Sequence, residues 1–117
     1  MTTLKNVREQ IRSDDGNWPV YLMDFVDEFR RTKDKKMIEE PFELVGDEQD
    51  ALLASTAEAL CDELEIDVPE WLSLVPACLK PYFVSGLENL KAISLVETPT
   101  RFRIRKVFVL DNFLTRV

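Results

Sequence analysis

The chain has 117 residues, a net charge of −7 and no histidine. That length suits one hydrophobic core, and 45% hydrophobic with 32% charged residues is typical of a folded globular protein rather than a disordered one. The lack of histidine excludes Ser-His and Cys-His nucleophile pairs and imidazole metal sites, and the sequence has no glycine-rich phosphate-binding motif. We therefore predict that the protein is not an enzyme and needs no cofactor.

Two amphipathic helices are expected in the first third of the chain. Leu4, Val7 and Ile11 follow helical spacing, and the sequence Asp14-Asp15-Gly16 ends this first segment. The second helix is expected to follow Asn17, which is a suitable N-cap. Its apolar face has near-ideal helical spacing and consists of Trp18, Leu22, Phe25, Val26 and Phe29.

Three more helices are expected between residues 47 and 98. The third covers residues 47–65, has acids in its first turn, where the helix dipole favours them, and turns an apolar stripe inward. Pro69 opens a short fourth helix that carries Trp71 and Leu72. The fifth begins at a capping box of Ser85 and Glu88 and stops at Thr98-Pro99. Its apolar face is expected to contain Leu87, Leu90, Ile93 and Val96.

The closing stretch has a different period. Side chains alternate from Phe102 to Leu110, which indicates an extended segment, and Asp111 is expected to cap a last turn after it. A lone strand has no obvious partner in a helical protein, and buried unpaired backbone is costly. Three solutions stay open. The segment crosses the helices as irregular structure, pairs with its copy in a homodimer through residues 102–110, or joins the sheet of another protein.

These elements predict an all-α fold, a compact bundle of about five helices with one extended segment near the C-terminus, in one domain over residues 1–117. No apolar run reaches the roughly 18 residues that a membrane span needs, and residues 1–13 have no apolar signal-peptide core. Cys61 and Cys78 are too few for a thiolate metal cage and are expected to be reduced and buried. We expect a cytoplasmic protein without a membrane contact.

Charge is distributed unevenly along the chain. Residues 37–79 contain twelve acids and no lysine or arginine, whereas residues 100–117 contain five bases and one acid. The simplest interpretation is that the two regions neutralise one another, with the forks of Arg103 and Arg105 pairing with acids of the middle segment. The alternative is that the acidic middle binds a basic partner. Nucleic acid is not expected to bind, because the net negative charge repels phosphate.

One carboxylate cluster has the spacing of a helix face. Glu58, Asp62 and Glu65 lie at positions i, i+4 and i+7 of the third helix. Such a face can present acids to a divalent ion, but it also describes an ordinary solvated surface, and no second cluster supplies the remaining ligands. We predict no metal site here.

The C-terminal two-fifths resembles a known family. Residues 69–117, from PEWLSLVP through TPTRFRIRKVFVLDNFLTRV, are similar to the C-terminal part of a family of small bacterial proteins. The family resembles partner components encoded beside helix-turn-helix regulators or nucleotidyltransferase-like toxins. Thr98 replaces the family's serine, and Lys106 stands where a second arginine is common. The matching positions are Pro99, Phe102, Arg103, Arg105, Phe108, Val109, Leu114 and Arg116.

Two functions remain as hypotheses. The first is a small protein-interaction protein, the antitoxin-like neutralising partner of a toxin or the accessory of a regulator, which acts by binding and occlusion. The second is a carboxylate-metal or cysteine-dependent enzyme of unknown substrate. For the first, the candidate interaction residues are Glu58, Asp62, Glu65, Arg103, Arg105 and Lys106.

Overall fold

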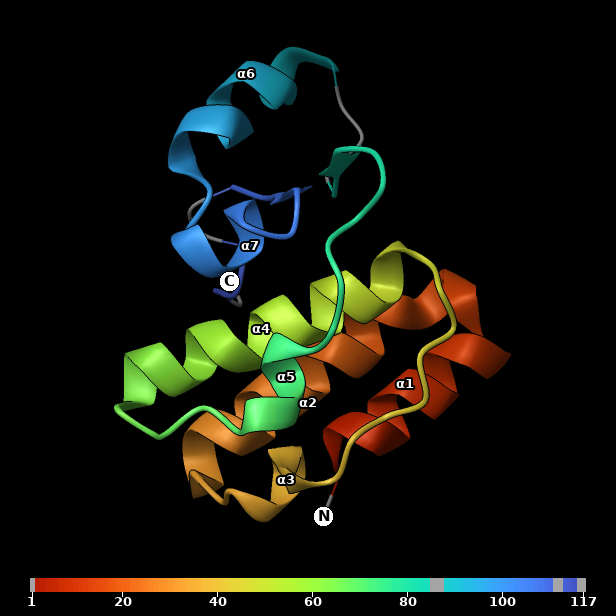
Figure 1. Ribbon diagram of the computed structural model, residues 1–117, viewed down its shortest axis with the longest axis vertical. Helices are drawn as coiled ribbons and strands as arrows, with labels where there is room; N and C mark the ends of the chain where they lie inside the picture. Colours follow the sequence, from red (N-terminus) through yellow and green to blue (C-terminus); the bar gives the residue numbers. More distant parts are fainter. Residues whose placement is uncertain (1, 85–87, 111–112, 116–117) are drawn as a thin grey trace.

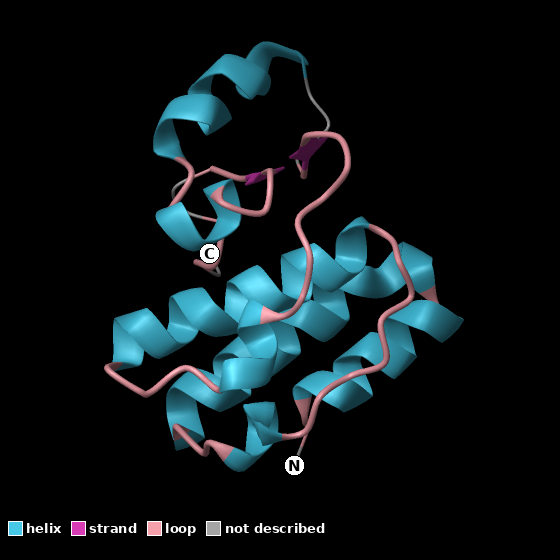
Figure 2. Cartoon of the chain, viewed as in Figure 1, coloured by secondary structure: helices cyan, strands magenta, loops and turns pink. Residues whose placement is uncertain are grey.

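The computed structural model describes residues 2–84, 88–110 and 113–115, and this part of the chain is mainly helical (Figure 2). A 3-10 turn, η1 (Asp15–Asn17), joins the first two helices, and two short strands, β1 (Tyr82–Phe83) and β2 (Val107–Phe108), form a small sheet. None of the described helices is long and apolar enough to cross a bilayer. The α-helices are α1 (Leu4–Ser13), α2 (Trp18–Thr32), α3 (Lys36–Glu39), α4 (Glu48–Leu64), α5 (Glu70–Ser73), α6 (Glu88–Glu97) and α7 (Thr100–Arg103).

The predicted N-terminal helices are confirmed. Thr3 and Asn6 form a reciprocal capping box at the start of α1. Asn17 lies at the start of α2 as predicted, but its amide donates to Asp14 at 2.7 Å instead of capping the helix. The apolar faces are buried, apart from half-buried Trp18, through Leu4, Val7, Ile11, Leu22, Phe25, Val26 and Phe29.

Helix α4 is the centre of the molecule. It begins after Asp47, whose carboxylate accepts the Gln49 N–H at 3.0 Å, and it ends at Glu65, which has a left-handed φ of 57°. Its side chains are buried on nearly every side, including Leu52, Leu53 and Leu60. A helix that is buried on most of its faces needs neighbours on several sides. In Figure 1, α1 and α2 lie on one side of α4, and α7 and the strands lie on the other.

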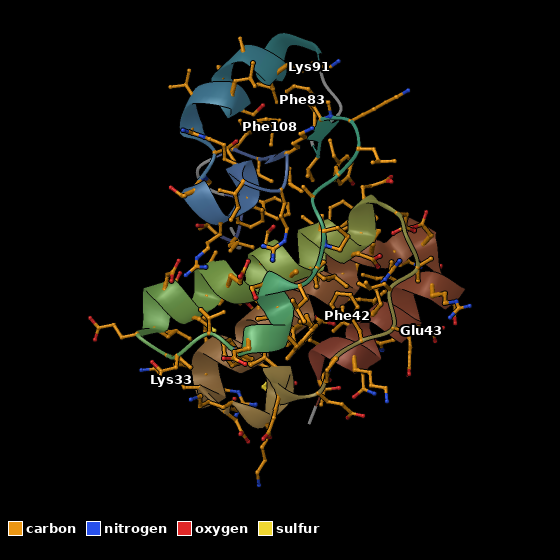
Figure 3. All side chains as sticks on the ribbon, in the orientation of Figure 1. Lys33, Phe42, Glu43, Phe83, Lys91 and Phe108 are labelled. Atoms are coloured by element: carbon orange, nitrogen blue, oxygen red, sulfur yellow. The ribbon has the colours of Figure 1, made fainter. Side chains whose placement is uncertain are left out.

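The small sheet joins two distant segments of the chain. Strands β1 and β2 are parallel, with Tyr82 opposite Val107 and Phe83 opposite Phe108. The Phe83 and Phe108 rings stack with centroids 5.1 Å apart, and the Lys91 ammonium of α6 lies 5.3 Å from the Phe83 centroid (Figure 3). Val107, on the opposite face of the sheet, is fully buried in the core. The sheet therefore lies between α6 and the helical core.

The predicted extended segment over residues 102–110 is wrong in its first half. Residues 100–103 form α7, and Lys106 then takes a left-handed φ of 61°, so the extended chain begins only at Val107. The predicted alternation is therefore broken at Lys106. The segment also finds a strand partner within its own chain, since β2 pairs with β1. This pairing removes the reason for expecting a partner strand from a second copy.

The fifth predicted helix exists, but part of its predicted apolar face is exposed. Helix α6 ends at Glu97, before Thr98-Pro99 as predicted, whereas Ile93 and Val96 face solvent. Ser94 and Thr98 are buried instead. The Thr98 hydroxyl accepts the Val109 N–H in the interior, and the Ser94 hydroxyl donates to the Lys91 carbonyl of its own helix. The predicted roles of Ser85, Leu87, Asp111 and Arg116 fall outside the described residues.

Candidate protein-interaction site

Glu58 and Arg105 form a buried ion pair. The Arg105 guanidinium donates to the Glu58 carboxylate, and it also donates to the Leu72 carbonyl at 2.6 Å and the Val75 carbonyl at 3.1 Å. Both side chains are at most 5% exposed. One arginine thus connects α4, the end of α5 and the C-terminal segment. These two predicted interaction residues are inside the protein, so they are not available to a partner.

A second arginine extends this pair to the surface. Arg101 binds the Asp62 carboxylate with two bonds of 2.8 and 3.0 Å, and it approaches Glu58 at 3.4 Å. The hydrogen bond to Asp62 raises the pKa of Arg101 above its usual value. The prediction that the basic tail pairs with acids of the middle segment is therefore confirmed for Arg105. For Arg103 the prediction is wrong, because Arg101 is the second arginine that pairs with acids of the middle segment.

The remaining predicted residues lie apart from this network. Arg103 donates to the backbone carbonyls of Val96 and Thr98, at 3.3 and 2.9 Å, and so caps the C-terminal end of α6. Glu65 is exposed at the end of α4, and Lys106 is exposed in the turn before β2. The structure thus brings Glu58, Asp62 and Arg105 together and leaves the other three elsewhere.

Most of the acidic middle is neutralised within the molecule. Arg8 is buried and binds Asp50 and Asp47, each at 2.8 Å, and Arg30 binds Glu63 at 2.8 Å. Seven of the twelve acids of residues 37–79 are in ion pairs: Glu40, Glu43, Asp47, Asp50, Glu58, Asp62 and Glu63. Five have no ion pair with any described residue: Glu39, Glu48, Glu65, Asp67 and Glu70. Most acids of this region thus pair with bases of the same chain, and of the paired acids only Asp50 and Glu58 are buried.

Acidic and cysteine side chains were the candidates for a metal site or a nucleophile. Residues 2–84, 88–110 and 113–115 contain no group of three histidine, cysteine, aspartate or glutamate side chains that could hold a metal ion. Burial raises the pKa of the Cys61 thiol to about 11 and also raises the pKa of Cys78. A higher thiol pKa means less thiolate at neutral pH, and thiolate is the nucleophilic form.

A groove of about 540 Å³ lies between the first turn of α4 and residues 76–82. We call it the Leu79 groove. Pro76, Ala77, Ala51 and Pro81 give it apolar walls, and Glu48 lies in the wall formed by α4. Leu79 itself is 97% exposed, the largest exposure of any large apolar side chain in the described residues.

Hydrogen bonds hold the groove's outer wall in place. The Cys78 N–H donates to the Arg105 carbonyl, and the Tyr82 N–H donates to the Lys106 carbonyl, each at 2.9 Å. Residues 79–81, between these two bonds, are exposed. Burial raises the pKa of Tyr82 to about 12, and the nearby Glu48 contributes in the same direction. Because a backbone hydrogen bond holds each end of this loop, the loop presents the exposed Leu79 in a fixed position.

Sequence reasoning missed this groove. The available signal was the run Pro76-Ala77-Cys78-Leu79-Lys80-Pro81, in which two prolines bracket an apolar residue outside any helix. The opposite wall comes from residues 46–51, about thirty positions earlier, and the sequence gives no indication that the two meet. No family model, curated protein or solved structure matches the chain.

Proposed function

We propose that the protein acts by binding another protein in the Leu79 groove. It is a small cytoplasmic interaction protein that works by occlusion, as the antitoxin-like neutralising partner of a toxin or as the accessory of a regulator. The exposure of Leu79 beside an apolar groove is the observation that carries this proposal. An apolar side chain in such a position gains free energy only when a partner covers it.

The groove also indicates the chemistry of the partner. Its walls are mainly apolar, and Glu48 has no ion pair with any described residue. A partner segment with an apolar side chain next to a lysine or arginine would fill the groove and pair with Glu48. The wall bounded by Pro76 and Pro81 loses little conformational freedom on binding, which favours affinity.

The Leu79 groove is a different binding surface from the one predicted from the sequence. Glu58 and Arg105 pair with each other inside the protein, so separating them for a partner would leave buried charges uncompensated, and Asp62 is engaged with Arg101. Arg103 and Lys106 lie outside the groove lining. A homodimer through residues 102–110 is not proposed, because β2 pairs with β1 and the Val109 N–H donates to Thr98.

Affinity capture from a lysate of the source cells tests the proposal. The tagged protein is expected to retain one stoichiometric partner, and Leu79→Asp and Glu48→Lys are expected each to reduce its recovery at least about tenfold, the effect of losing roughly 1.4 kcal/mol. Leu74→Asp and Glu65→Lys are matched controls, since Leu74 is 78% exposed and Glu65 is an exposed acid, both outside the groove. Both controls are expected to retain the partner. Undiminished recovery with Leu79→Asp and Glu48→Lys would refute the groove, and no partner at any salt concentration would refute the function.

A further inference from the structure

A second cavity adjoins the Leu79 groove. It has a volume of about 320 Å³ and lies between α1, η1 and the start of α4. We call it the Trp18 pocket. Asp47, Glu48 and Tyr82 line both cavities, so the groove and the pocket meet at the first turn of α4. The volume is at the lower end of the range for small-ligand pockets, roughly 300–1,000 Å³.

The basic side chains of the pocket lining already have acids of this chain as counter-ions. The guanidinium of Arg8 is buried and binds Asp47 and Asp50, each at 2.8 Å. Arg12 is 62% exposed, and its guanidinium lies 3.7 Å from Glu43, which is not part of the lining. The pocket therefore does not need an anion to neutralise its bases.

Two carboxylates of the lining have no such counter-ion. Asp15 of η1 and Glu48 of α4 are exposed, and neither has an ion pair with any described residue. Both lie near Tyr82, since burial raises the pKa of Tyr82 to about 12 and the charges of Glu48 and Asp15 contribute in the same direction. The pocket therefore favours a cation.

The pocket lining also includes an unused hydrogen-bond acceptor and two aromatic side chains. Gln49 is 5% exposed, and its Oε1 accepts no hydrogen bond from the described residues. A buried polar atom without a partner is costly, so a ligand that brings an N–H donor to Gln49 removes that cost. Trp18 and Tyr82 line the same pocket, and the faces of such rings attract cations.

We propose that the Trp18 pocket receives an arginine side chain of the partner that occupies the Leu79 groove. This inference rests on the proposed function and specifies the partner's residue. A guanidinium is flat, has five N–H donors and stacks on aromatic rings, so it suits this lining better than the compact ammonium of lysine. Because Glu48 and Tyr82 belong to both cavities, one extended segment fills the groove with an apolar side chain and places a neighbouring arginine in the pocket.

A titration of the full chain with N-acetyl-arginine amide at low ionic strength, followed by NMR correlation spectra, tests the pocket without a partner protein. The chain has two tryptophans, and each gives its own indole N–H signal. The Trp18 signal is expected to shift to saturation with a dissociation constant of about 1–10 mM. Trp71 is the internal control and is expected not to shift, because its indole donates to the Ile38 carbonyl and lines neither cavity.

Matched probes and variants identify what the pocket recognises. N-acetyl-citrulline amide has nearly the same shape without the charge and is expected to bind at least about tenfold more weakly, and N-acetyl-lysine amide at least about threefold. Glu48→Gln and Asp15→Asn are each expected to weaken binding of the arginine probe at least about threefold. Glu70→Gln is the control, because Glu70 is an exposed acid outside both cavities, and it is expected to bind like the wild type.

Three results would overturn the inference: a Trp18 signal that does not move up to about 50 mM probe, equal binding of the arginine and citrulline probes, or equal effects of the three variants. Each of these leaves the proposed function standing, because the probe is measured without a partner and does not depend on the Leu79 groove. Affinity capture that yields no partner would refute the proposed function and this inference together.

Discussion

Glu58→Met is expected to lower the free energy of unfolding by about 3–5 kcal/mol, the cost of removing one partner of a buried ion pair. The change leaves the Arg105 guanidinium buried without its carboxylate, and only the Leu72 and Val75 carbonyls remain as its acceptors. Urea unfolding followed by circular dichroism measures the loss. Glu70→Met is the control, because Glu70 is exposed and has no ion pair with any described residue, and it is expected to change stability by less than about 0.5 kcal/mol.

A loss as small as the control's would mean that Arg105 reaches solvent or another acid when Glu58 is absent. The neighbouring Arg101 cannot neutralise Arg105 when Glu58 is absent, because both arginines are positively charged. The removal of Glu58 therefore leaves Arg101 paired with Asp62 and leaves Arg105 without an ion pair to any described residue.

Arg8→Met is expected to cost about 3 kcal/mol, because it leaves the Asp50 carboxylate charged and buried. Asp50 keeps the N–H donors of Val45 and Gly46, at 2.8–3.2 Å, which limit but do not cancel that cost. The same unfolding measurement applies. Arg12→Met is the control, since Arg12 is 62% exposed and approaches Glu43 only at 3.7 Å.

The control is expected to change stability by less than about 1 kcal/mol, as exposed ion pairs do. Equal effects of the two changes would show that burial of Arg8 contributes nothing beyond a surface pair. Because the loop before α4 is held by Asp50, Arg8→Met is also expected to make this loop more accessible to proteolysis.

Helices α1, α2, α4 and α5 could be predicted because their signals are local, whereas the short helix α3 was not predicted. In α2 the spacing of Leu22, Phe25, Val26 and Phe29 specifies the buried face. Asp47 marks the start of α4 through its side-chain cap. Each signal involves residues within a few turns of one another, and no distant segment has to be known.

The C-terminal third could not be predicted in the same way, because distant contacts decide it. Ile93 and Val96 have helical spacing, yet the bonds of Thr98 and Arg103 turn α6 so that these side chains face outward. The alternation in residues 102–110 suggested a strand, but the left-handed turn at Lys106 divides the segment into a helix and a short strand.

For the candidate site, the sequence allowed us to predict only that bases of the tail pair with acids of the middle segment. The opposed charges of the middle and the tail indicated that Arg105 pairs with an acid of the middle segment, which Glu58 provides. Sequence could not distinguish Arg101 from Arg103 as the second pairing arginine, because that choice depends on how α7 lies against α4. The Leu79 groove depends in the same way on packing between distant segments.

A double-mutant cycle on Glu58 and Arg105 tests most directly whether the basic tail exists to neutralise the acidic middle. Unfolding free energies are measured for the wild type, Glu58→Met, Arg105→Met and the double variant. We expect each single change to be strongly destabilising and the double variant to recover part of the loss, with a coupling energy of about 2 kcal/mol or more. Additivity within about 0.5 kcal/mol would contradict the account, because the two charges would then contribute independently.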